Sequence, residues 1–484
     1  MVLEEKYEPV IGLEVHIQLL TKSKAFSSDS AEFGADTNTN VSVISLGHPG
    51  VLPKINEKML EYGVRLGLAC NCNITRENEF ARKNYFYADL PKGYQISQHT
   101  TPVCTGGYIT VKTVDGQEKP INLTRIHMEE DSGKSLHDQD PFNSLIDLNR
   151  AGVPLLEMVS EPEIKSPEEA YQYLAEVRKL VRYLDICDGN MEEGSLRCDA
   201  NVSVKLKGAQ KFGEKVEVKN MNSIRNVQRA LEYEITRQIS DLESNRPIHQ
   251  ETRSFDPVTG KTSVMRTKEM ADDYRYFPEP DLPKVIVTEQ YIEAIKKTMP
   301  RLPGELYRKY TEQYGLSVYD ASVITDSKAT ADFFEKLIES TQNHKAAANW
   351  IMGPVKSYLN ANGIAIENFP VSVQNLAALI QMVDEGIISF SGATANVFHE
   401  LAAHPEKSPM DIIKEKNLVQ DFDENMIREL IQKALDKYPD KVAEYKNGKK
   451  GLAGLFMGEV MKLSKGKADP NKASILLQKI LETI

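Results

Sequence analysis

Residues 10–20, VIGLEVHIQLL, alternate between apolar side chains and polar or small ones. Successive side chains of a β-strand point to opposite faces, so this segment written as a strand has two distinct faces. The apolar face carries Ile11, Leu13, Val15, Ile17 and Leu19, and the opposite face carries Gly12, Glu14, His16 and Gln18. The segment therefore predicts a strand with one side in the core. Its second face is either solvent-exposed or the wall of a site.

The length and composition of the chain limit the classes of protein it can be. Its 484 residues are too many for a single core, so about three domains are expected. No apolar run approaches the ~20 residues that cross a bilayer, and the acidic N-terminus, MVLEEKYEP, lacks an apolar signal core. Five cysteines are too few for a disulfide framework. We therefore expect a cytoplasmic protein with no membrane attachment.

Neither the total charge nor the cysteines identify a site. The net charge of −11 argues against a surface coated for nucleic acid, although a local basic surface is compatible with it. Cys70, Cys72 and Cys104 are a conceivable zinc set, but no fourth cysteine lies near them in the sequence.

The first part of the chain mixes short strands with a few helices. LRCDANVSVKL and KVEVKN are predicted strands joined by a turn, and a helix is predicted over about 167–185. Ser166 and Pro167 provide its N-cap and first-turn proline, and an apolar stripe follows at helical spacing. The pattern has no repeating strand–helix unit. It therefore predicts an α+β fold with antiparallel sheets over 1–295.

The rest of the chain is helical in pattern. Segments such as ADFFEKLIES predict an all-helical domain over 296–408, and HPEKSP (404–409) marks a break. Residues 409–484 are again helical and rich in lysine, with a last helix that begins at Asp469-Pro470.

Polar faces recur on several predicted strands. TRIHMEEDSGK brings together His127, Glu129, Glu130 and Asp131. Arg197, Asp199 and Asn201 share one face of their strand, and Glu217 and Lys219 can join them if the two strands pair. Carboxylates, an amide and an imidazole beside cationic side chains match a site for Mg²⁺ and phosphate. Phosphoryl transfer needs little else, because positioning and charge stabilisation dominate it.

Other catalytic devices are missing from the sequence. It contains neither a GxxxxGK[ST] loop nor a GxSxG elbow. Cys198 alternates onto the apolar face of its strand, which favours a core position over a nucleophile. The chain thus lacks an evident device for hydrolysing an amide.

Two kinds of segment are candidates for RNA contact. ARKNYFYADLPKGYQISQ (81–98) and DDYRYFPEPDLP (272–283) mix aromatic and basic residues, which suits RNA ends or a nucleotide, or else a hairpin with aromatic core positions. Near the C-terminus, glycine-interrupted lysines suit an RNA backbone, or else a solvated helical surface. These are Lys446, Lys449, Lys450, Lys462, Lys465 and Lys467.

Six long motifs, in order, resemble the B-subunit family of the bacterial aspartyl/glutamyl-tRNA(Asn/Gln) amidotransferases. They are IGLEVHIQL, ARKNYFYADLPKGYQISQ, HMEEDSGKS, DLNRAGVPLLEMVSEP, MEEGSLRCDANVSV and DDYRYFPEPDLP. The resemblance implies a cradle domain with the active site (1–295), a helical domain (296–408) and a tRNA-binding tail domain (409–484). One departure is Ala88, where the family pattern leads us to expect proline.

The resemblance also implies a reaction. ATP and Mg²⁺ would serve to phosphorylate the side-chain carboxylate of mischarged Glu-tRNA(Gln) or Asp-tRNA(Asn), and ammonia would displace the phosphate. An amidase-type A subunit would supply the ammonia, and a small C subunit would complete a heterotrimer. By this resemblance the expected metal ligands are Glu14, His16, Glu130 and Glu217, with Glu129 as a further catalytic residue. Lys83, Arg197, Asp199, Asn201 and Lys219 are expected to contact ATP, and the lysines of the tail to contact tRNA.

Two alternatives remain at this stage. One is an Mg²⁺/ATP ligase for a free small molecule, against which the lysine-rich tail argues. The other is a tRNA-binding scaffold without catalysis, against which the clustered carboxylates argue, because they would repel RNA unless a metal neutralised them.

Overall fold

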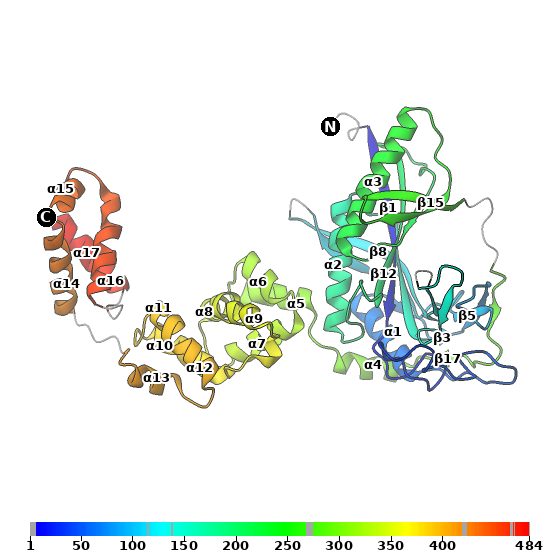
Figure 1. The fold of residues 1–484 in the computed structure, drawn as a ribbon, viewed down its shortest axis with the longest axis horizontal. Coiled ribbons are helices and arrows are strands. Elements are labelled where there is room, and N and C mark those ends of the chain that lie inside the picture. The colour runs from blue at the N-terminus through cyan, green and yellow to red at the C-terminus, as the bar shows by residue number, and fades with distance from the viewer. Residues whose placement is uncertain are drawn as a thin grey trace. The chain divides into compact units, whose positions relative to one another are not determined.

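The structure, a computed structural model, describes residues 6–113, 116–136, 139–267, 274–418, 424–464, 468 and 470–483. Two compact units divide the chain, Met1–Leu302 and Pro303–Ile484. The first unit is rich in strands and the second is helical (Figure 1). The α+β class expected from the sequence is therefore confirmed. No helix among the described residues is long and apolar enough to cross a membrane.

The first unit is built on a large sheet, with four helices among its described residues. In chain order its elements are β1 (Tyr7–Gln18), α1 (Glu57–Ala69), β2 (Asn73–Ile74), β3 (Glu77–Asn78), β4 (Ala81–Asn84), β5 (Tyr94–Ser97), β6 (Cys104–Thr105), β7 (Tyr108–Lys112), β8 (Glu118–Glu130), β9 (Lys134–Leu136), β10 (Leu145–Asp147), β11 (Pro154–Ser160), α2 (Pro167–Tyr183), β12 (Leu196–Leu206), β13 (Val216–Lys219), α3 (Ile224–Glu243), β14 (Glu251–Asp256), β15 (Lys261–Thr267), β16 (Phe277–Pro278), β17 (Val285–Ile286) and α4 (Glu289–Thr298).

The main sheet runs β15-β14-β13-β12-β1-β11-β8-β6-β2, with β7 paired to β8. The predicted pairing of the two strands β12 and β13 is confirmed, and β1 lies between β11 and β12. The pairing is antiparallel, as expected, in every described pair of strands except β13 and β14, which are parallel. The helix α3 connects these two strands, and such a crossover is what parallel neighbours require.

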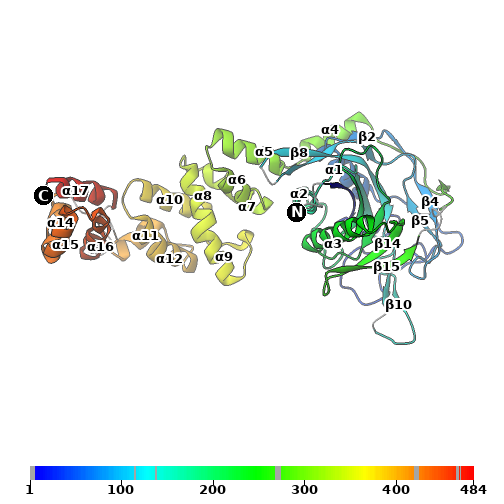
Figure 2. The same ribbon diagram turned by 90° about the horizontal axis from the view of Figure 1, so that it is seen from above.

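The apolar face of the sheet forms the core of the first unit. In one row across four strands, Met128, Leu156, Ile17 and Leu196 lie opposite one another and are fully buried. The helices α1, α2 and α3 contribute to the same core. Figure 2 shows α2 and α3 on one side of the sheet and the β4–β5 pair on the other. The helices therefore cover the apolar face and leave the polar face toward the β4–β5 side.

The helix α2 follows the sequence prediction closely. The hydroxyl of Ser166 accepts a hydrogen bond from the backbone N–H of Glu169 at 3.1 Å, as an N-cap should. Leu174, Val177 and Val181 are fully buried, so the predicted apolar stripe faces the core.

The second unit contains only helices among its described elements. They are α5 (Pro303–Arg308), η1 (Lys309–Gln313), α6 (Val318–Ile324), α7 (Lys328–Ile338), α8 (His344–Trp350), η2 (Ile351–Val355), α9 (Lys356–Asn362), η3 (Ile366–Asn368), α10 (Val373–Asp384), α11 (Phe390–Gly392), η4 (Ala393–Phe398), α12 (His399–Ala403), α13 (Pro409–Glu415), α14 (Glu424–Lys437), α15 (Pro439–Lys446), η5 (Lys450–Leu452), α16 (Ala453–Leu463) and α17 (Pro470–Thr483). The last four α-helices share a hydrophobic cluster that includes Ile427, Phe456 and Leu477.

The structure bears on the predicted boundaries in two ways. The first compact unit extends to Leu302, and Ile292 and Ile295 of α4 lie in its core. A separate tail domain over 409–484 stays a prediction, although α14–α17 have a hydrophobic cluster of their own.

Candidate functional site

Four neighbouring strands align polar side chains in one row across the sheet. His127 of β8 pairs with Glu157 of β11. Glu157 also pairs with His16 of β1, which pairs in turn with Arg197 of β12. This row lies one residue along from the buried apolar row, so its side chains project from the opposite face. The second face of the opening strand is therefore not simply exposed to solvent.

Two side chains of this row, His16 and Glu157, converge with that of Glu129, which lies two residues after His127 on the same face of β8. One ligand atom each from His16, Glu129 and Glu157 lie within 4.8 Å of one another. The Nε2 atom of His16 is 3.5 Å from Glu157 Oε2, and the Nε2 atom of His127 is 3.3 Å from the same oxygen. The side chains of Glu129 and Glu157 are only 3% and 12% exposed. We call His16, Glu129 and Glu157 the acidic cluster.

The two imidazoles and the carboxylates stabilise each other's charged forms. Burial lowers the pKa of His16, but the hydrogen bond and charge of Glu157 outweigh it and leave a net rise. For His127, burial again opposes the rise, yet Glu129 and Glu157 raise its pKa to about 9. Burial raises the pKa of Glu157, but both imidazoles hold it well below its usual range. The cluster therefore favours an ionised Glu157 with charged imidazoles close by.

The residues of the acidic cluster fit a divalent cation. The buried carboxylate of Glu129, the 12% exposed carboxylate of Glu157 and one nitrogen of His16 meet within the spacing that one ion can bridge. His16 would release its proton when it binds the ion. Mg²⁺ takes one or two protein carboxylates and fills its remaining positions with water and phosphate. The Nδ1 atom of His127 is buried and has no hydrogen-bond partner among the described residues.

The next row toward the start of β1 contains Glu14. It pairs with Asp199 of β12 and accepts a hydrogen bond from the amide of Asn201 at 2.7 Å. Burial raises the pKa of Glu14, and the charge of Glu157 adds to the rise. Lys219 contacts Asp199 and lies 3.1 Å from Glu217, so these two acids are already paired with an ammonium.

Three of the four expected metal ligands, Glu14, Glu130 and Glu217, do not lie in the acidic cluster. Glu217 of β13 accepts a hydrogen bond from Thr252 at 2.9 Å and pairs with Lys219. Glu130 follows Glu129 in β8 and so projects from the other face, toward the side that carries Met128. Three expected ligands do lie at the polar face. His16 lies within the cluster, Glu14 lies in the next row, and Glu217 lies in line with Asn201 and Gly12.

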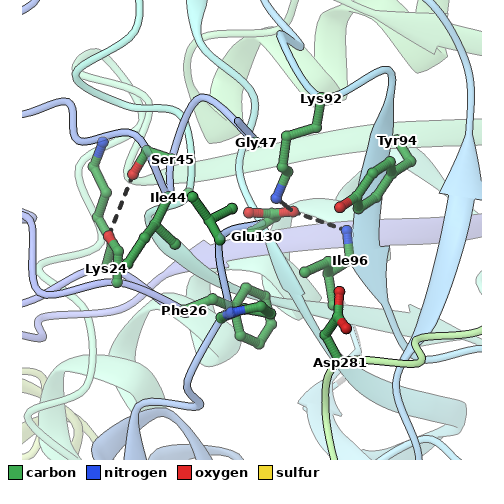
Figure 3. Close-up of a pocket in the computed structure, with 14 residues that line it drawn as sticks. Lys24, Phe26, Ile44, Ser45, Gly47, Lys92, Tyr94, Ile96, Glu130 and Asp281 are labelled. Carbon is green, nitrogen blue, oxygen red and sulfur yellow. Dashed lines mark hydrogen bonds and ion pairs between the residues drawn. The ribbon is translucent and has the colours of Figure 1, made fainter. Parts of the chain in front are cut away.

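Glu130 lines a separate small pocket, which Tyr94 and Ile96 of β5 also border (Figure 3). Its carboxylate contacts the ammonium of Lys92 and accepts a hydrogen bond from the backbone N–H of Ile96 at 2.9 Å. Lys24 also lines this pocket and donates hydrogen bonds to the carbonyl oxygen of Asn40 at 2.6 Å and to that of Leu148 at 3.3 Å. We call this cavity the Lys92–Glu130 pocket.

Two of the expected ATP contacts lie beside the acidic cluster. The ammonium of Lys83 is 4.9 Å from the ring centre of Tyr274. Burial lowers the pKa of Lys83, but the charge of Glu129 and its neighbours leaves a net rise, which keeps the ammonium charged. The guanidinium of Arg197 donates two hydrogen bonds to the carboxylate of Asp131, at 2.8 and 3.0 Å. Arg197 also lies opposite His16 on the neighbouring strand.

The sequence analysis overlooked Glu157 and gave His127 no role. Glu157 lies in the segment PLLEMVS, where it is the one charged residue in an otherwise apolar strand. A single charge in such a strand could have identified Glu157 as a candidate site residue. The partners of Glu157 could not be identified from the sequence, because they lie on strands that are distant in the sequence.

The aromatic-basic segment is a hairpin. The strands β4 and β5 pair antiparallel, with Phe277 of β16 opposite Arg82. Phe86 and Tyr87, at its turn, are 79% and 62% exposed. The hairpin is therefore confirmed, but these two rings are not core residues. Residues 272 and 273 lie outside the described part of the chain.

Four of the six tail lysines can be placed. Lys446 ends α15, Lys462 lies near the end of α16, and both are exposed. Lys449 is exposed and 3.0 Å from Glu444, and the ammonium of Lys450 lies 4.2 Å from the ring centre of Tyr445. Lys465 and Lys467, with Asp469 of the expected helix cap, lie outside the described residues. Contact of the tail with tRNA stays a prediction.

Known families match most of the chain. The family described as GatB/GatE catalytic domain matches residues 9–293, and the family described as GatB domain matches residues 332–481. The first match contains the whole main sheet of the first unit from Pro9 on, and thus every residue of the acidic cluster.

Similar proteins cover the chain from end to end. A relative from Thermodesulfovibrio yellowstonii is 48% identical over 477 residues, which are 99% of this chain and 100% of the relative. A relative from Caldicellulosiruptor bescii is 49% identical over 482 residues, again 99% and 100%. A relative from Bdellovibrio bacteriovorus is 49% identical over 476 residues, 98% and 99%. All three carry the name of the B subunit of aspartyl/glutamyl-tRNA(Asn/Gln) amidotransferase.

Proposed function

Because the chain belongs to the GatB family, we propose that it acts as the B subunit of an aspartyl/glutamyl-tRNA amidotransferase and activates the tRNA-linked carboxylate itself. The substrates are Glu-tRNA(Gln), Asp-tRNA(Asn) or both, together with ATP. The γ-phosphoryl group of ATP passes to a side-chain carboxylate oxygen, which releases ADP. Ammonia then attacks the acyl carbon, and inorganic phosphate leaves as the amide forms.

The observation that carries this proposal is the acidic cluster with its flanking cations. A carboxylate is a poor acyl donor, because its leaving group would be oxide, whereas an acyl phosphate has a good leaving group. Phosphoryl transfer depends on positioned charges rather than on a covalent device, and the polar face supplies both signs within one row. A buried face also excludes the water that would hydrolyse the acyl phosphate.

Each group on this face has a proposed role. Mg²⁺, when bound by His16, Glu129 and Glu157, would neutralise phosphate oxygens and orient ATP. Lys83 lies beside the cluster and would bind a phosphate oxygen or the incoming carboxylate. Arg197 is held by Asp131 and would keep the His16 ring in position from the neighbouring strand.

The partners follow from the chemistry that the chain lacks. The sequence has no GxSxG elbow, so an amidase-type A subunit would release ammonia from glutamine, and a small C subunit would complete a heterotrimer. The lysines of the tail would hold the body of the tRNA through its phosphates. Such a complex would be a cytoplasmic ligase of protein synthesis.

The test separates activation from glutamine hydrolysis. The protein is incubated with ATP, Mg²⁺, mischarged tRNA and ammonium chloride, without glutamine. We expect ADP, phosphate and the amidated aminoacyl-tRNA in equal amounts. Amide formation that needs glutamine but no ATP would contradict the proposal.

Two controls sharpen this result. Correctly charged Gln-tRNA has no free side-chain carboxylate, so it should not stimulate ADP release. Free glutamate offered with uncharged tRNA should also be inactive, whereas activity on it would support the ligase for a free small molecule instead.

A further inference from the structure

A returning segment of the chain lies against β4, the strand that carries Lys83. It consists of residues 274–279, and we call it the strap. Phe277 of β16 pairs with Arg82 of β4, and the guanidinium of Arg82 donates two hydrogen bonds of 2.8 Å to the buried carboxylate of Glu279. The C-terminal end of the strap is therefore fixed to β4 by an ion pair.

Asn84, the last residue of β4, holds the N-terminal end of the strap. Its backbone N–H donates a hydrogen bond to the carbonyl oxygen of Tyr274 at 3.0 Å. Its side-chain amide donates to the carbonyl oxygen of Arg275 at 2.8 Å and to that of Tyr274 at 3.3 Å. One asparagine thus binds two consecutive carbonyl groups of the strap.

The backbone of the strap is strained at the point where Asn84 holds it. Arg275 has a φ angle of +44°, in the left-handed region that residues other than glycine rarely adopt. Such a conformation persists only where the surrounding contacts fix it. The amide of Asn84 is one of these contacts, because it binds the carbonyl oxygen of Arg275 itself.

The strap places an aromatic ring beside Lys83. The ammonium of Lys83 lies 4.9 Å from the ring centre of Tyr274 and 5.8 Å from that of Tyr85, and both distances suit a cation–π interaction. The carboxylate of Glu129 acts on this ammonium through its charge, without an ion pair among the described residues. Because a lysine side chain is long and flexible, the two rings are what direct the ammonium. The ring of Tyr274 depends on the strap for its place.

We propose that Asn84 is a positioning residue for the activation step: it fixes the strap, holds the ring of Tyr274 against Lys83 and so keeps that ammonium beside the acidic cluster. This rests on the proposed function, in which Lys83 binds a phosphate oxygen or the incoming carboxylate. The amide of Asn84 is engaged with backbone carbonyl groups, so it acts through the strap rather than on a substrate. A displaced ammonium would stabilise the transferring phosphoryl group much less, since this chemistry depends on positioned charges.

The test uses two substitutions and a control for each. Asn84→Asp keeps the size of the side chain but replaces the donating amide with a carboxylate, and Tyr274→Leu removes the ring. In each variant, the kcat of ADP release with ATP, Mg²⁺ and mischarged tRNA should fall by roughly tenfold or more, while the KM for that tRNA stays unchanged. Tyr274→Phe keeps the ring and should retain the kcat. Asn368→Asp makes the same exchange at an exposed position and should have no effect.

Two further measurements distinguish positioning from a general loss of structure. The double variant should lose no more activity than the more affected single variant, because both substitutions act through the same ring. Trypsin should cleave after Arg275 faster in Asn84→Asp than in the unchanged protein, because the strap is held less firmly. Mass spectrometry of the peptides measures this cleavage independently of activity.

The possible results separate this inference from the proposed function. If the unchanged protein releases no ADP, the proposed function fails, and this inference falls with it. If it does release ADP but both single variants are normal, or their losses multiply in the double variant, Asn84 does not act through Tyr274 and the inference is wrong. A raised KM for mischarged tRNA with an unchanged kcat would assign the strap to RNA binding and overturn it as well. If Asn84→Asp does not fold, the comparison of Tyr274→Leu with Tyr274→Phe decides, and equal losses in these two would overturn the inference.

Discussion

At the scale of single residues, Lys24 shows what burial does to a charge. Its side chain lies in the wall of the Lys92–Glu130 pocket and is 1% exposed. Burial lowers its pKa to about 8, although Asp29 and Glu130 act in the opposite direction. Its hydrogen bonds to two backbone carbonyl groups keep it in place, and no carboxylate of the described residues is in direct contact with it.

This burial predicts how stability depends on pH. Between pH 8 and the ordinary value of 10.5, the unfolded chain binds a proton at Lys24 that the folded protein does not. Protonation therefore favours unfolding, and the free energy of unfolding should rise with pH across this window, by at most about 1.4 kcal/mol per pH unit. Lys24→Met removes this contribution. Urea unfolding of both proteins at several pH values should show that the free energy of unfolding of the unchanged protein rises relative to that of Lys24→Met as the pH rises. A difference in free energy that stays constant with pH would contradict this prediction.

Neighbouring residues also show the limit of sequence analysis at this scale. Glu129 and Glu130 are chemically equivalent in the sequence, yet one lies in the acidic cluster and the other binds Lys92. Only the alternation of β8 and its exact register decide between them, and both carboxylates lie near the end of that strand. His16 was identified because its own strand alternates clearly, whereas Glu157 needed its partners to be known.

At the scale of elements, the local sequence pattern was sufficient to predict an element where that element is long. The alternation of β1 and the capped apolar stripe of α2 are both present in the structure, because each depends on residues close in sequence. The two-residue strands β2, β6 and β17 have no such pattern and form through pairing with distant strands.

The row of polar residues is a property of pairing rather than of any one element. The strand β1 pairs with β11 and β12, which follow it by more than a hundred residues. A one-residue slip in either ladder would turn Glu157 or Arg197 to the apolar face. The buried row of Met128, Leu156 and Ile17 makes that slip costly, and in this way the core fixes the geometry of the site.

At the scale of the whole molecule, the residues proposed for catalysis and the lysines of the tail lie in different compact units. The acidic cluster belongs to the first compact unit, and the lysines of the tail belong to the second. This division would allow a chain with a net charge of −11 to bind the RNA partner that we propose, because the basic residues need only be locally dense.

The tail should account for much of the tRNA affinity. We predict that deleting residues 409–484 weakens tRNA binding strongly while the first unit keeps its core. Changing Lys446, Lys449 and Lys450 to Gln should give a smaller loss and a shallower dependence on salt, by about 0.7–0.9 in the log–log slope for each phosphate contact removed. Filter binding at several salt concentrations measures both. Unchanged affinity after the deletion would rule out this role.

The central claim is that the acidic cluster carries out ATP-dependent activation of the tRNA-linked carboxylate. The variant Glu157→Gln keeps the shape of a cluster side chain but removes its charge, and Glu77→Gln is the matched control, since that side chain is 68% exposed. Both variants should bind mischarged tRNA normally and show folded circular-dichroism spectra.

The decisive measurement is ADP release stimulated by mischarged tRNA. In Glu157→Gln it should fall by roughly a hundredfold or more, because the site loses a ligand of the ion that neutralises the transferring phosphoryl group. In Glu77→Gln it should stay unchanged. A folded, tRNA-binding Glu157→Gln protein that releases ADP at nearly the normal rate would contradict the account.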